Sequence, residues 1–591
     1  MTDTALGVTE SLSGRHWLWR EAEPRIAQAI AQRLDAPELV GRILALRGLQ
    51  PDTAPDFVEP TLRALMPDPS VLQDMDQAAA RLAQAVRAGE TVAVFGDYDV
   101  DGACSGAIMA LVLRSLGCTV LSYVPDRMTE GYGPNTMALE GLADQGATLI
   151  VCVDCGTAAA AILAPLAPRC DIIVLDHHAA QGDLPRVAAV VNPNRPDCTS
   201  GLRMLCAGGV AFMTAVALHR TLRRQGFFTD RPEPDLKALL DLVALSTVCD
   251  VMPLTGLNRA FVTAGLRVLE RRARPGLAAL LDVAKVHEKP TAMSLGWTLG
   301  PRINAAGRIS EADLGLRLLV AEDAQSATHL AATLDSINRT RQSVESDILD
   351  QAMAMAEQQI QAGHAAILVA GVQWHIGVVG IIAGRIKERF NRPALVANRG
   401  DGMAKGSGRS VPGIDLGAAV IAAKAHGLLM TGGGHPMAAG FALREENLPA
   451  LHAFLDERLA AARILPGAAD LDVEGTLSLA GCTAELAEQL ARLAPFGAGN
   501  PEPVLVLPRV RAVIAQRIGR EGNTLRVFLE GEGGPRLKSV LFRAGDTPLA
   551  KALESRDGAV FHAAGHLRLE SWQGRTSLGF TIVDAALAKH A

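Results

Sequence analysis

The feature that most constrains the fold is a regular alternation of short apolar runs and amphipathic helical segments between about residues 75 and 200. The runs are continuous and rich in β-branched residues, which is typical of strands buried on both faces of a parallel sheet. They lie at residues 91–95, 148–153, 171–175 and 187–191. Because strands alternate with helices here, the sequence predicts a doubly wound α/β domain with a parallel sheet.

The patterns change on either side of this domain. Residues 1–70 contain short helical patterns that are interrupted by prolines, and residues 205–285 have a mostly helical pattern. No proline occurs between Pro301 and Pro393, and apolar residues keep a helical spacing through this polar stretch. We therefore expect one long helix over about residues 322–362 that links two parts of the chain.

A second α/β segment is expected at residues 364–465, with strands at 366–371 and 393–398. After about residue 466 the pattern becomes a series of short strands separated by polar turns. The expected strands are residues 510–518, 524–531, 537–545, 559–569 and 576–585. Such a series favours a small β-barrel similar to an OB-fold, which often binds single-stranded nucleic acid but does not by itself establish that function.

Acidic and histidine side chains directly follow three of the predicted strands. GDYDVDG (96–102) follows the first, Asp154 follows the second, and Asp176-His177-His178 follows the third. A further acid, Asp250, follows the apolar segment 242–248. Because the carboxyl ends of parallel strands meet at one edge of a sheet, we expect these side chains to lie close together.

So many carboxylates at one edge repel each other unless positive charge compensates them. Mixed Asp and His ligands without thiolate are typical of Mn²⁺ or Mg²⁺ rather than of a structural zinc ion. Two such ions that share a carboxylate would form a site for phosphoryl transfer. One Asp after a strand is usually only a helix N-cap, but three strand ends together with Asp-His-His favour the metal site.

Composition restricts the class of protein. The chain has 591 residues, about half of them apolar, which is enough for several domains with full cores. No apolar run is long enough to span a bilayer, and the first residues do not resemble a secretory signal, so we expect a cytoplasmic protein. The 9 cysteines are scattered, which fits reduced thiols. The net charge of −6 argues weakly against a nucleic-acid partner.

The order of the motifs resembles a known group of enzymes, the DHH phosphoesterase superfamily. Its four motifs match GDYDVDG, VDCG (153–156), DHH (176–178) and VCDVMPL (248–254). The segment TGGGHPMAAG (431–440) resembles the signature of the DHH-associated domain. The RecJ family within this superfamily is indicated by GWTLGPRINAAGRI (296–309), WHIGVVGIIAGRI (374–386), SGRS (407–410) and PFGAGNPEP (495–503).

The resemblance implies a two-metal exonuclease that degrades single-stranded DNA from its 5′ end to 5′-mononucleotides in recombination and repair. The implied cofactors are two divalent ions, Mn²⁺ or Mg²⁺. The implied partners are single-stranded DNA, single-strand-binding protein and a RecQ-type helicase. Two alternatives stay open: another DHH phosphodiesterase, acting on oligoribonucleotides or cyclic dinucleotides, and a non-catalytic replication scaffold of the Cdc45 type.

The resemblance also implies roles for individual residues. The metal ligands would be Asp99, Asp101, Asp154, His177 and Asp250, with Asp97 as a further candidate. Asp154 would bridge the two ions, Asp176 would orient a ligating histidine, and His178 would take part in catalysis. Many DHH enzymes carry a histidine four residues before the first ligating Asp, where this chain has Phe95, so the first ion would have fewer ligands.

A second set of residues would hold the DNA and its 5′-phosphate. Arginine forks, a hydroxyl and glycine backbone amides are groups that bind phosphate well. The set comprises Arg127, Arg302, Asn304, Arg308, Ser407, Arg409, Gly433, Gly434 and His435.

Together these motifs predict five domains. They are an N-terminal arm (1–70), a DHH catalytic domain (71–290), a connecting segment with the long helix (291–363), a DHH-associated domain (364–465) and an OB-fold-like nucleic-acid-binding domain (466–591).

Overall fold

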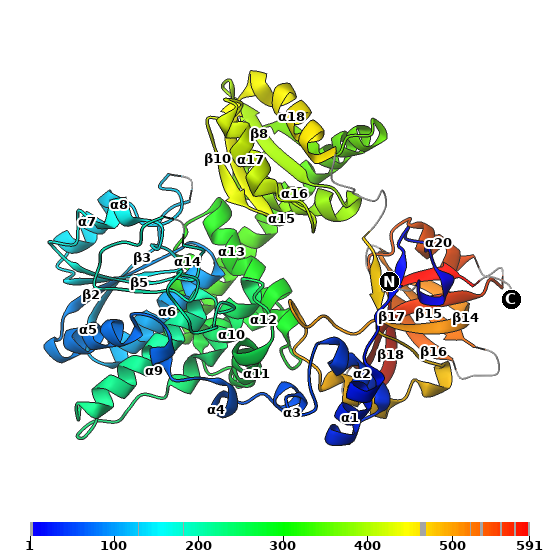
Figure 1. The fold of residues 1–591 in the computed structure, drawn as a ribbon, viewed down its shortest axis with the longest axis horizontal. Coiled ribbons are helices and arrows are strands. Elements are labelled where there is room, and N and C mark those ends of the chain that lie inside the picture. The colour runs from blue at the N-terminus through cyan, green and yellow to red at the C-terminus, as the bar shows by residue number, and fades with distance from the viewer. Residues whose placement is uncertain are drawn as a thin grey trace. The chain divides into compact units, whose positions relative to one another are not determined.

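The computed structural model contains two compact units, which are described separately (Figure 1). The central unit comprises residues 55–340 and 495–501, and the terminal unit comprises residues 1–54, 341–494 and 502–591. The structure describes residues 4–127, 129–180, 182–460, 469–519, 522–531, 536–555, 558–572 and 575–588.

The central unit is built on a parallel sheet of five strands in the order β3-β2-β4-β5-β6. The strands are β2 (Thr91–Gly96), β3 (Thr119–Tyr123), β4 (Leu149–Val153), β5 (Asp171–Leu175) and β6 (Ala189–Val191). The four predicted strands are therefore confirmed. The sequence missed β3, whose side chains at the sheet edge are half-buried or exposed and give no apolar run.

Helices cover both faces of this sheet, as expected for a doubly wound fold. One apolar core joins alternate residues of the strands, such as Val94 and Val151, to α5, α6 and α9. The other core joins the intervening residues, such as Phe95 and Cys152, to α7. The first helices of the central unit are α3 (Ala54–Val58), α4 (Leu62–Leu65), η2 (Pro69–Val71), α5 (Met75–Ala88), α6 (Val100–Ser115), α7 (Thr136–Asp144), α8 (Ala160–Leu163), α9 (Ala207–Arg224), η3 (Leu236–Leu239) and α10 (Leu240–Cys249).

The rest of the central unit is helical up to the predicted long helix, which is confirmed as α15 (Ala324–Gln361). The preceding helices are α11 (Gly256–Glu270), α12 (Pro275–Val283), the π-helix η4 (Ser294–Leu299), α13 (Gly300–Ile309) and α14 (Leu314–Leu319). Within the described ranges, no helix has both the length and the apolar character needed to cross a membrane.

The terminal unit contains a mixed sheet in the order β10-β11-β9-β8-β7. The two predicted strands are confirmed as β7 (Ile367–Val372) and β8 (Ala394–Gly400). The sequence missed β9 (Met403–Arg409), β10 (Thr431–His435) and β11 (Ala438–Arg444), which are rich in glycine and alanine and so have weak strand propensity. The helices here are α16 (Ile376–Phe390), α17 (Leu416–Ala425), η5 (Glu445–Asn447) and α18 (Leu448–Ala460).

The five strands predicted near the C-terminus all form, and their pairing returns to its starting strand. β14 pairs with β15, β15 with β16, β16 with β18, β18 with β17, and β17 again with β14. The elements are β12 (Leu471–Val473), β13 (Gly475–Thr476), η6 (Leu479–Gly481), α19 (Ala484–Ala491), β14 (Leu505–Ile518), β15 (Thr524–Glu530), β16 (Leu537–Leu541), α20 (Pro548–Glu554), β17 (Phe561–Trp572) and β18 (Arg575–Leu587). A closed ring of five strands is the arrangement expected of an OB-fold.

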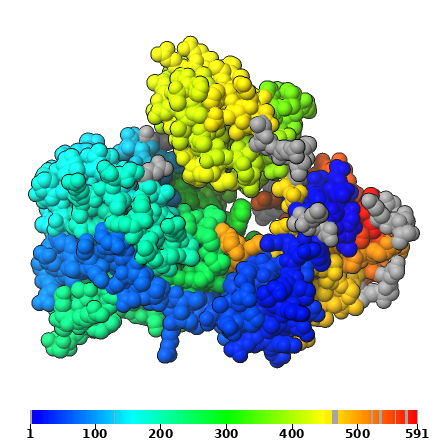
Figure 2. Space-filling model, in the orientation of Figure 1, coloured from blue at the N-terminus to red at the C-terminus, as the bar shows by residue number. Residues whose placement is uncertain are grey.

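The first residues of the chain pack on this ring. They form η1 (Ala5–Gly7), β1 (Trp17–Trp19), α1 (Pro24–Leu34) and α2 (Glu38–Leu46), drawn in dark blue beside the orange and red strands in Figure 1 and as dark blue atoms in Figure 2. β1 pairs in parallel with β12, and the indole of the fully buried Trp17 donates to Asp584 Oδ2 at 2.9 Å. The predicted domain boundaries stay predictions, but residues up to 54 belong to the terminal unit.

Candidate metal centre

The acids of the central unit meet because three strands end at the same level. Gly96 pairs with Val153, and Val153 pairs with Leu175. The residues that follow, Asp97, Asp154 and Asp176, therefore leave the sheet side by side. After β2 the chain forms β3 on one side of β2 and then β4 on its other side, so the strand order reverses at β2. Open α/β sheets bind ligands at such a reversal, beyond the carboxyl ends of the strands, and the acids lie there.

The turn after β2 carries three acids into the start of α6. Asp99 is the N-cap of this helix, and its Oδ1 accepts from the backbone N–H groups of Asp101, at 2.8 Å, and Gly102, at 3.0 Å. A Cβ on Gly102 would lie 2.3 Å from the Asp97 carbonyl oxygen, so only glycine allows the turn to close this tightly. Asp97 and Asp101 are both buried within it.

Asp154 and Asp250 sit at strained turns. Asp154 has φ +60°, and Val251, directly after Asp250, has φ +58°. Such left-handed conformations are costly for residues other than glycine, most of all for a β-branched valine, and they collect at functional sites. The Tyr132 hydroxyl donates to the Asp154 carbonyl oxygen at 3.1 Å and so supports the first of these turns.

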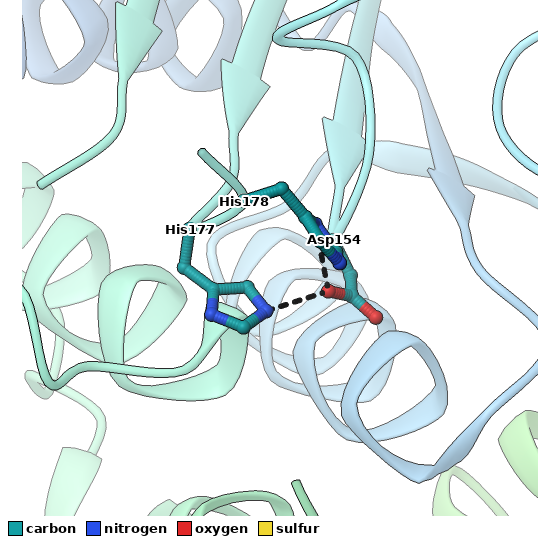
Figure 3. Close-up of side chains that lie close together, drawn as sticks. All are labelled: Asp154, His177 and His178. Carbon is teal, nitrogen blue, oxygen red and sulfur yellow. Dashed lines mark ion pairs between the residues drawn. The ribbon is translucent and has the colours of Figure 1, made fainter. Parts of the chain in front are cut away.

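His177 is the meeting point of the acids. Its Nε2 lies 3.3 Å from Asp154 Oδ1 and 3.5 Å from both Asp101 Oδ2 and Asp250 Oδ2. Figure 3 shows both imidazoles, His177 and His178, directed toward the Asp154 carboxylate. These separations are longer than a good hydrogen bond but close to the spacing, about 3 Å, of neighbouring ligand atoms around one small divalent ion.

Ligand atoms gather in three overlapping groups. Within each group they lie within 4.8 Å of one another. The groups are Asp154-His177-His178, Asp101-His177-Asp250 and Asp97-Asp99-Asp154. Asp154 belongs to two of them, which is the position that a carboxylate shared by two ions would take.

The electrostatics of these acids are unfavourable without a cation. Burial, together with the charge of Asp99, raises the pKa of Asp97 to about 8, and burial together with Asp101 raises the pKa of Asp250 to about 8. Burial and neighbouring carboxylates also raise the pKa of Asp99 and that of Asp154. Each acid therefore resists ionisation in this environment.

Unpaired oxygens support the same conclusion. Among the described residues, no hydrogen-bond partner reaches the buried atoms Asp97 Oδ1, Asp154 Oδ1 or Asp250 Oδ2. A buried carboxylate oxygen without a partner is costly, whereas a divalent cation would satisfy all three. Oxygen and imidazole donors without thiolate suit Mn²⁺ or Mg²⁺, so the residues fit the metal ions that the sequence predicts.

Asp176 and His178 form a pair beside this cluster. Asp176 Oδ1 accepts from His178 Nδ1 at 2.8 Å, and its Oδ2 accepts from the Thr157 amide at 3.0 Å. Although burial alone would lower it, the bond and charge of Asp176 raise the pKa of His178 to about 9. The pKa of Asp176 is lowered because its bonds with His178 and Thr157 outweigh burial. His178 is 49% exposed at its side chain, so a substrate can reach it.

Phe95 offers no ligand at the position where many DHH enzymes carry histidine. Its ring is fully buried in the core and stacks on Tyr123 with centroids 5.5 Å apart.

Several predicted DNA-binding residues of the central unit already contact other groups of the protein. The guanidinium of Arg127 lies 5.2 Å from the centroid of the Tyr98 ring. Arg302 Nε donates to Asp335 Oδ1 at 2.9 Å, and Asn304 Oδ1 accepts from the Val100 amide at 3.1 Å. Asn304 therefore ties α13, which also carries the half-buried Arg308, to the first turn of α6.

The predicted phosphate-binding residues of the terminal unit share one face of its sheet. Across β9, β11 and β10, Ser407 is level with Gly433, and Arg409 is level with His435. Residues level with one another on paired strands point to the same face. No atom of the described residues would lie within 4 Å of a Cβ on Gly433, so the face is open there. Gly434 alternates to the other face, where a Cβ would meet the Ala438 carbonyl oxygen at 2.3 Å.

Sequence reasoning missed several residues that hold the site. Asn194 and Asn192 donate to the carbonyl oxygens of His177, at 2.6 Å, and His178, at 2.9 Å. This segment directly follows β6, so the sequence could have placed the two asparagines at the same edge of the sheet as the acids. Tyr132 carried no comparable signal, because it lies in a loop between β3 and α7.

Comparison with known proteins agrees with this architecture. The model of the DHH family N-terminal domain matches residues 91–247, that of the DHHA1 domain matches 363–461, and that of the RecJ OB domain matches 473–584. The chain is 34% identical to the single-stranded-DNA-specific exonuclease RecJ of Bacillus subtilis, over 98% of this chain and 71% of that protein. It is 37% identical to the protein of the same name in Escherichia coli, over 87% of this chain and 90% of the relative.

A solved structure supports the same relationship. The crystal structure of RecJ in complex with Mn²⁺ from Thermus thermophilus superposes with a TM-score of 0.79 at 30% sequence identity. The match covers 96% of this chain and 79% of that one. The three domain matches, the long alignments with curated exonucleases and this common fold together show that the chain belongs to the RecJ family.

Proposed function

We propose that this chain is a metal-dependent exonuclease that degrades single-stranded DNA from the 5′ end to 5′-mononucleotides, in recombination and repair. The observation that carries the proposal is the cluster of buried acids around His177. The relatives at 34% and 37% identity, which are named single-stranded-DNA-specific exonucleases, support the same activity. The alternatives, another DHH phosphodiesterase or a replication scaffold, account less well for the matched OB domain and for the retained acids.

The proposed ligand sets are based on two of the three groups of donor atoms, Asp101-His177-Asp250 and Asp97-Asp99-Asp154. Asp101, His177 and Asp250 would bind one ion, and Asp99 with Asp97 the other. Asp154 would bind both ions, because it shares one group with Asp97 and Asp99 and its Oδ1 lies 3.3 Å from Nε2 of His177, a ligand of the other ion. Mn²⁺ or Mg²⁺ bound there would offset the charge of a phosphodiester and make water more acidic.

His178 and Asp176 would handle a proton beside these ligands. The bond and charge of Asp176 raise the pKa of His178, which suits this imidazole to hold and donate a proton rather than to accept one. Its Nδ1 faces Asp176, so its Nε2 is the nitrogen that can reach a substrate. We assign it the role of protonating or hydrogen-bonding an oxygen of the cleaved phosphate.

Each unit carries residues that would bind DNA. Arg127 and Arg308 would contact the strand, while Arg302 and Asn304, already bonded to Asp335 and Val100, would also fix the position of α13. Ser407, Arg409, Gly433, Gly434 and His435 would bind the 5′-phosphate. Support comes from the open glycine surface at Gly433, beside the guanidinium of Arg409 and the imidazole of His435 on one sheet face.

The wider setting follows from the family. We infer a cytoplasmic protein that works beside single-strand-binding protein and a RecQ-type helicase. All cysteines in the described part of the chain are free thiols, which fits a reducing compartment.

The direct test is digestion of end-labelled single-stranded DNA in the presence of Mn²⁺. Mononucleotides should be released from strands that are blocked at the 3′ end but not from strands blocked at the 5′ end. Degradation of both strands or of neither contradicts the proposed direction. Asp154→Asn should abolish cleavage and leave DNA binding, whereas Asp171→Asn, at the opposite end of β5, should keep wild-type activity.

A further inference from the structure

The carboxylate of Asp101 is held by donors from two helices that lie far from it in the sequence. The first amides of α9 reach it: Ala207 N–H donates to Oδ2 at 2.8 Å, and Gly208 N–H donates to Oδ1 at 2.9 Å. The hydroxyl of Ser246, on α10, donates to Oδ1 as well. The direction is fixed, because an ionised carboxylate only accepts hydrogen bonds.

These donors leave Asp101 with one usable oxygen. Oδ1 accepts two hydrogen bonds, which occupy both of its lone pairs. Among the described residues Oδ2 accepts one hydrogen bond, from Ala207, and it is the atom that lies 3.5 Å from His177 Nε2. Asp101 can therefore offer a metal ion a single oxygen, and the second oxygen acts as an anchor to the protein.

A buried thiol sets the orientation of the Ser246 hydroxyl. Cys206 is the residue before α9, and its Sγ lies 3.0 Å from Ser246 Oγ. Because the only hydrogen of the Ser246 hydroxyl points to Asp101, the Cys206 S–H is the donor in this contact. Thr247 Oγ1, whose own hydrogen goes to the Val243 carbonyl oxygen, is a more distant acceptor at 3.5 Å. Burial raises the pKa of Cys206, so the thiol keeps this hydrogen. The result is a directed chain from Cys206 through Ser246 to Asp101.

Close packing leaves little room for any other arrangement. Cys206 and Ser246 are both fully buried. A Cβ on Gly208 would lie 2.3 Å from Ser246 Oγ and 3.5 Å from Asp101 Oδ1, so glycine is needed for α9 to begin against this hydroxyl.

We propose that Ser246 is a positioning residue of the metal centre, which holds Asp101 as a one-oxygen ligand, and that Cys206 orients the Ser246 hydroxyl. The inference rests on the proposed metal-binding role of Asp101. Groups that orient a ligand typically change metal affinity by about 10- to 100-fold when they are removed. Neither residue follows a strand of the sheet, which is why the motif pattern did not reveal them.

The test measures Mn²⁺ binding by the full chain without DNA, from the EPR signal of free Mn²⁺. Ser246→Ala should weaken binding by about 10- to 100-fold. The matched control is Ser105→Ala, because Ser105 is equally buried but donates at 2.7 Å to the backbone oxygen of Asp101, not to its carboxylate. This control should bind Mn²⁺ within about twofold of wild type.

The possible outcomes separate the two proposals. If wild type binds no Mn²⁺, the proposed metal centre itself is refuted. If wild type binds and Ser246→Ala binds equally well, or if both serine variants lose affinity equally, only the role of Ser246 is refuted. Thermal unfolding without metal should give similar midpoints for the two variants.

Cys206→Ala provides a second, milder variant. It should weaken Mn²⁺ binding less than Ser246→Ala, because the Ser246 hydroxyl can still reach Asp101 but is less constrained. In the double variant the Cys206 change should add nothing, since it acts through Ser246. Additive losses would overturn the proposed chain of hydrogen bonds.

Discussion

Binding of Mn²⁺ should release protons, and the number can be worked from the raised pKa values. Asp97 and Asp250 each have a pKa of about 8 in the metal-free protein. At pH 7 an acid of that pKa is protonated in about 90% of molecules, and a metal ligand must be ionised. Saturation of the site should therefore release about 1.8 protons at pH 7 from these two groups, and about 0.2 at pH 9.

Isothermal titration calorimetry in buffers of different ionisation enthalpy measures the total release, to which Asp99 and Asp154 add because their pKa values are raised as well. The apparent Mn²⁺ affinity should also rise steeply between pH 6 and pH 8 and then level off. Asp97→Asn should release about one proton fewer than wild type, which identifies one of the two sources. A release near zero at pH 7, or the same release at pH 7 and pH 9, would refute the argument that these carboxyls are protonated until a cation binds.

The same shifts determine how the metal-free protein responds to pH. The pKa of each acid is raised above its ordinary value of 3.8, so the folded state binds more protons than the unfolded state between about pH 4 and pH 8. Stability measured in EDTA should accordingly fall as the pH rises through this window, and saturating Mn²⁺ should reduce the dependence.

Three further changes test other parts of the structure. Arg409→Ala should reduce the preference for a 5′-phosphorylated strand more than it reduces total DNA binding, measured by competition between strands with and without the phosphate. Gly102→Ala should sharply lower both Mn²⁺ affinity and cleavage, because its Cβ would meet the Asp97 carbonyl oxygen at 2.3 Å; unchanged affinity would contradict the tight turn. Trp17→Phe should destabilise the terminal unit by about 1–3 kcal/mol in denaturant unfolding, because the buried Asp584 Oδ2 loses its indole donor. The same variant should leave the Mn²⁺ affinity unchanged.

The sequence was sufficient to find the acids because their positions depend on local rules. Each follows a buried strand or helix, and parallel strands that end in register place their next residues together. The helix-cap interpretation of an Asp after a strand was also correct for Asp99, which accepts two amide hydrogen bonds at the start of α6. Capping uses only Oδ1, so it does not prevent Asp99 from binding a metal through its other oxygen.

The parts that the sequence did not reveal depend on contacts between distant segments. The amide of Ala207 bonds to Asp101 across 106 positions, and no periodic pattern links them. The pairing of Trp17 with Leu471 is a short parallel contact of the same kind. β10 was missed for a different reason, since a run of glycines carries no polarity alternation and resembles a turn.

The charges at the site explain why the net charge of −6 is a poor guide to the partner of this chain. Of the six acids at the site, Asp176 is paired with His178, and Asp101 is held by the N-terminus of α9. The other four are those whose pKa burial and mutual repulsion raise: Asp97, Asp99, Asp154 and Asp250. Fully ionised, these four and Asp101 carry −5, which two divalent cations would reduce to −1. Because Asp176 and His178 form an ion pair that adds no net charge, the site would present a phosphodiester with a nearly neutral cluster rather than with a repulsive one.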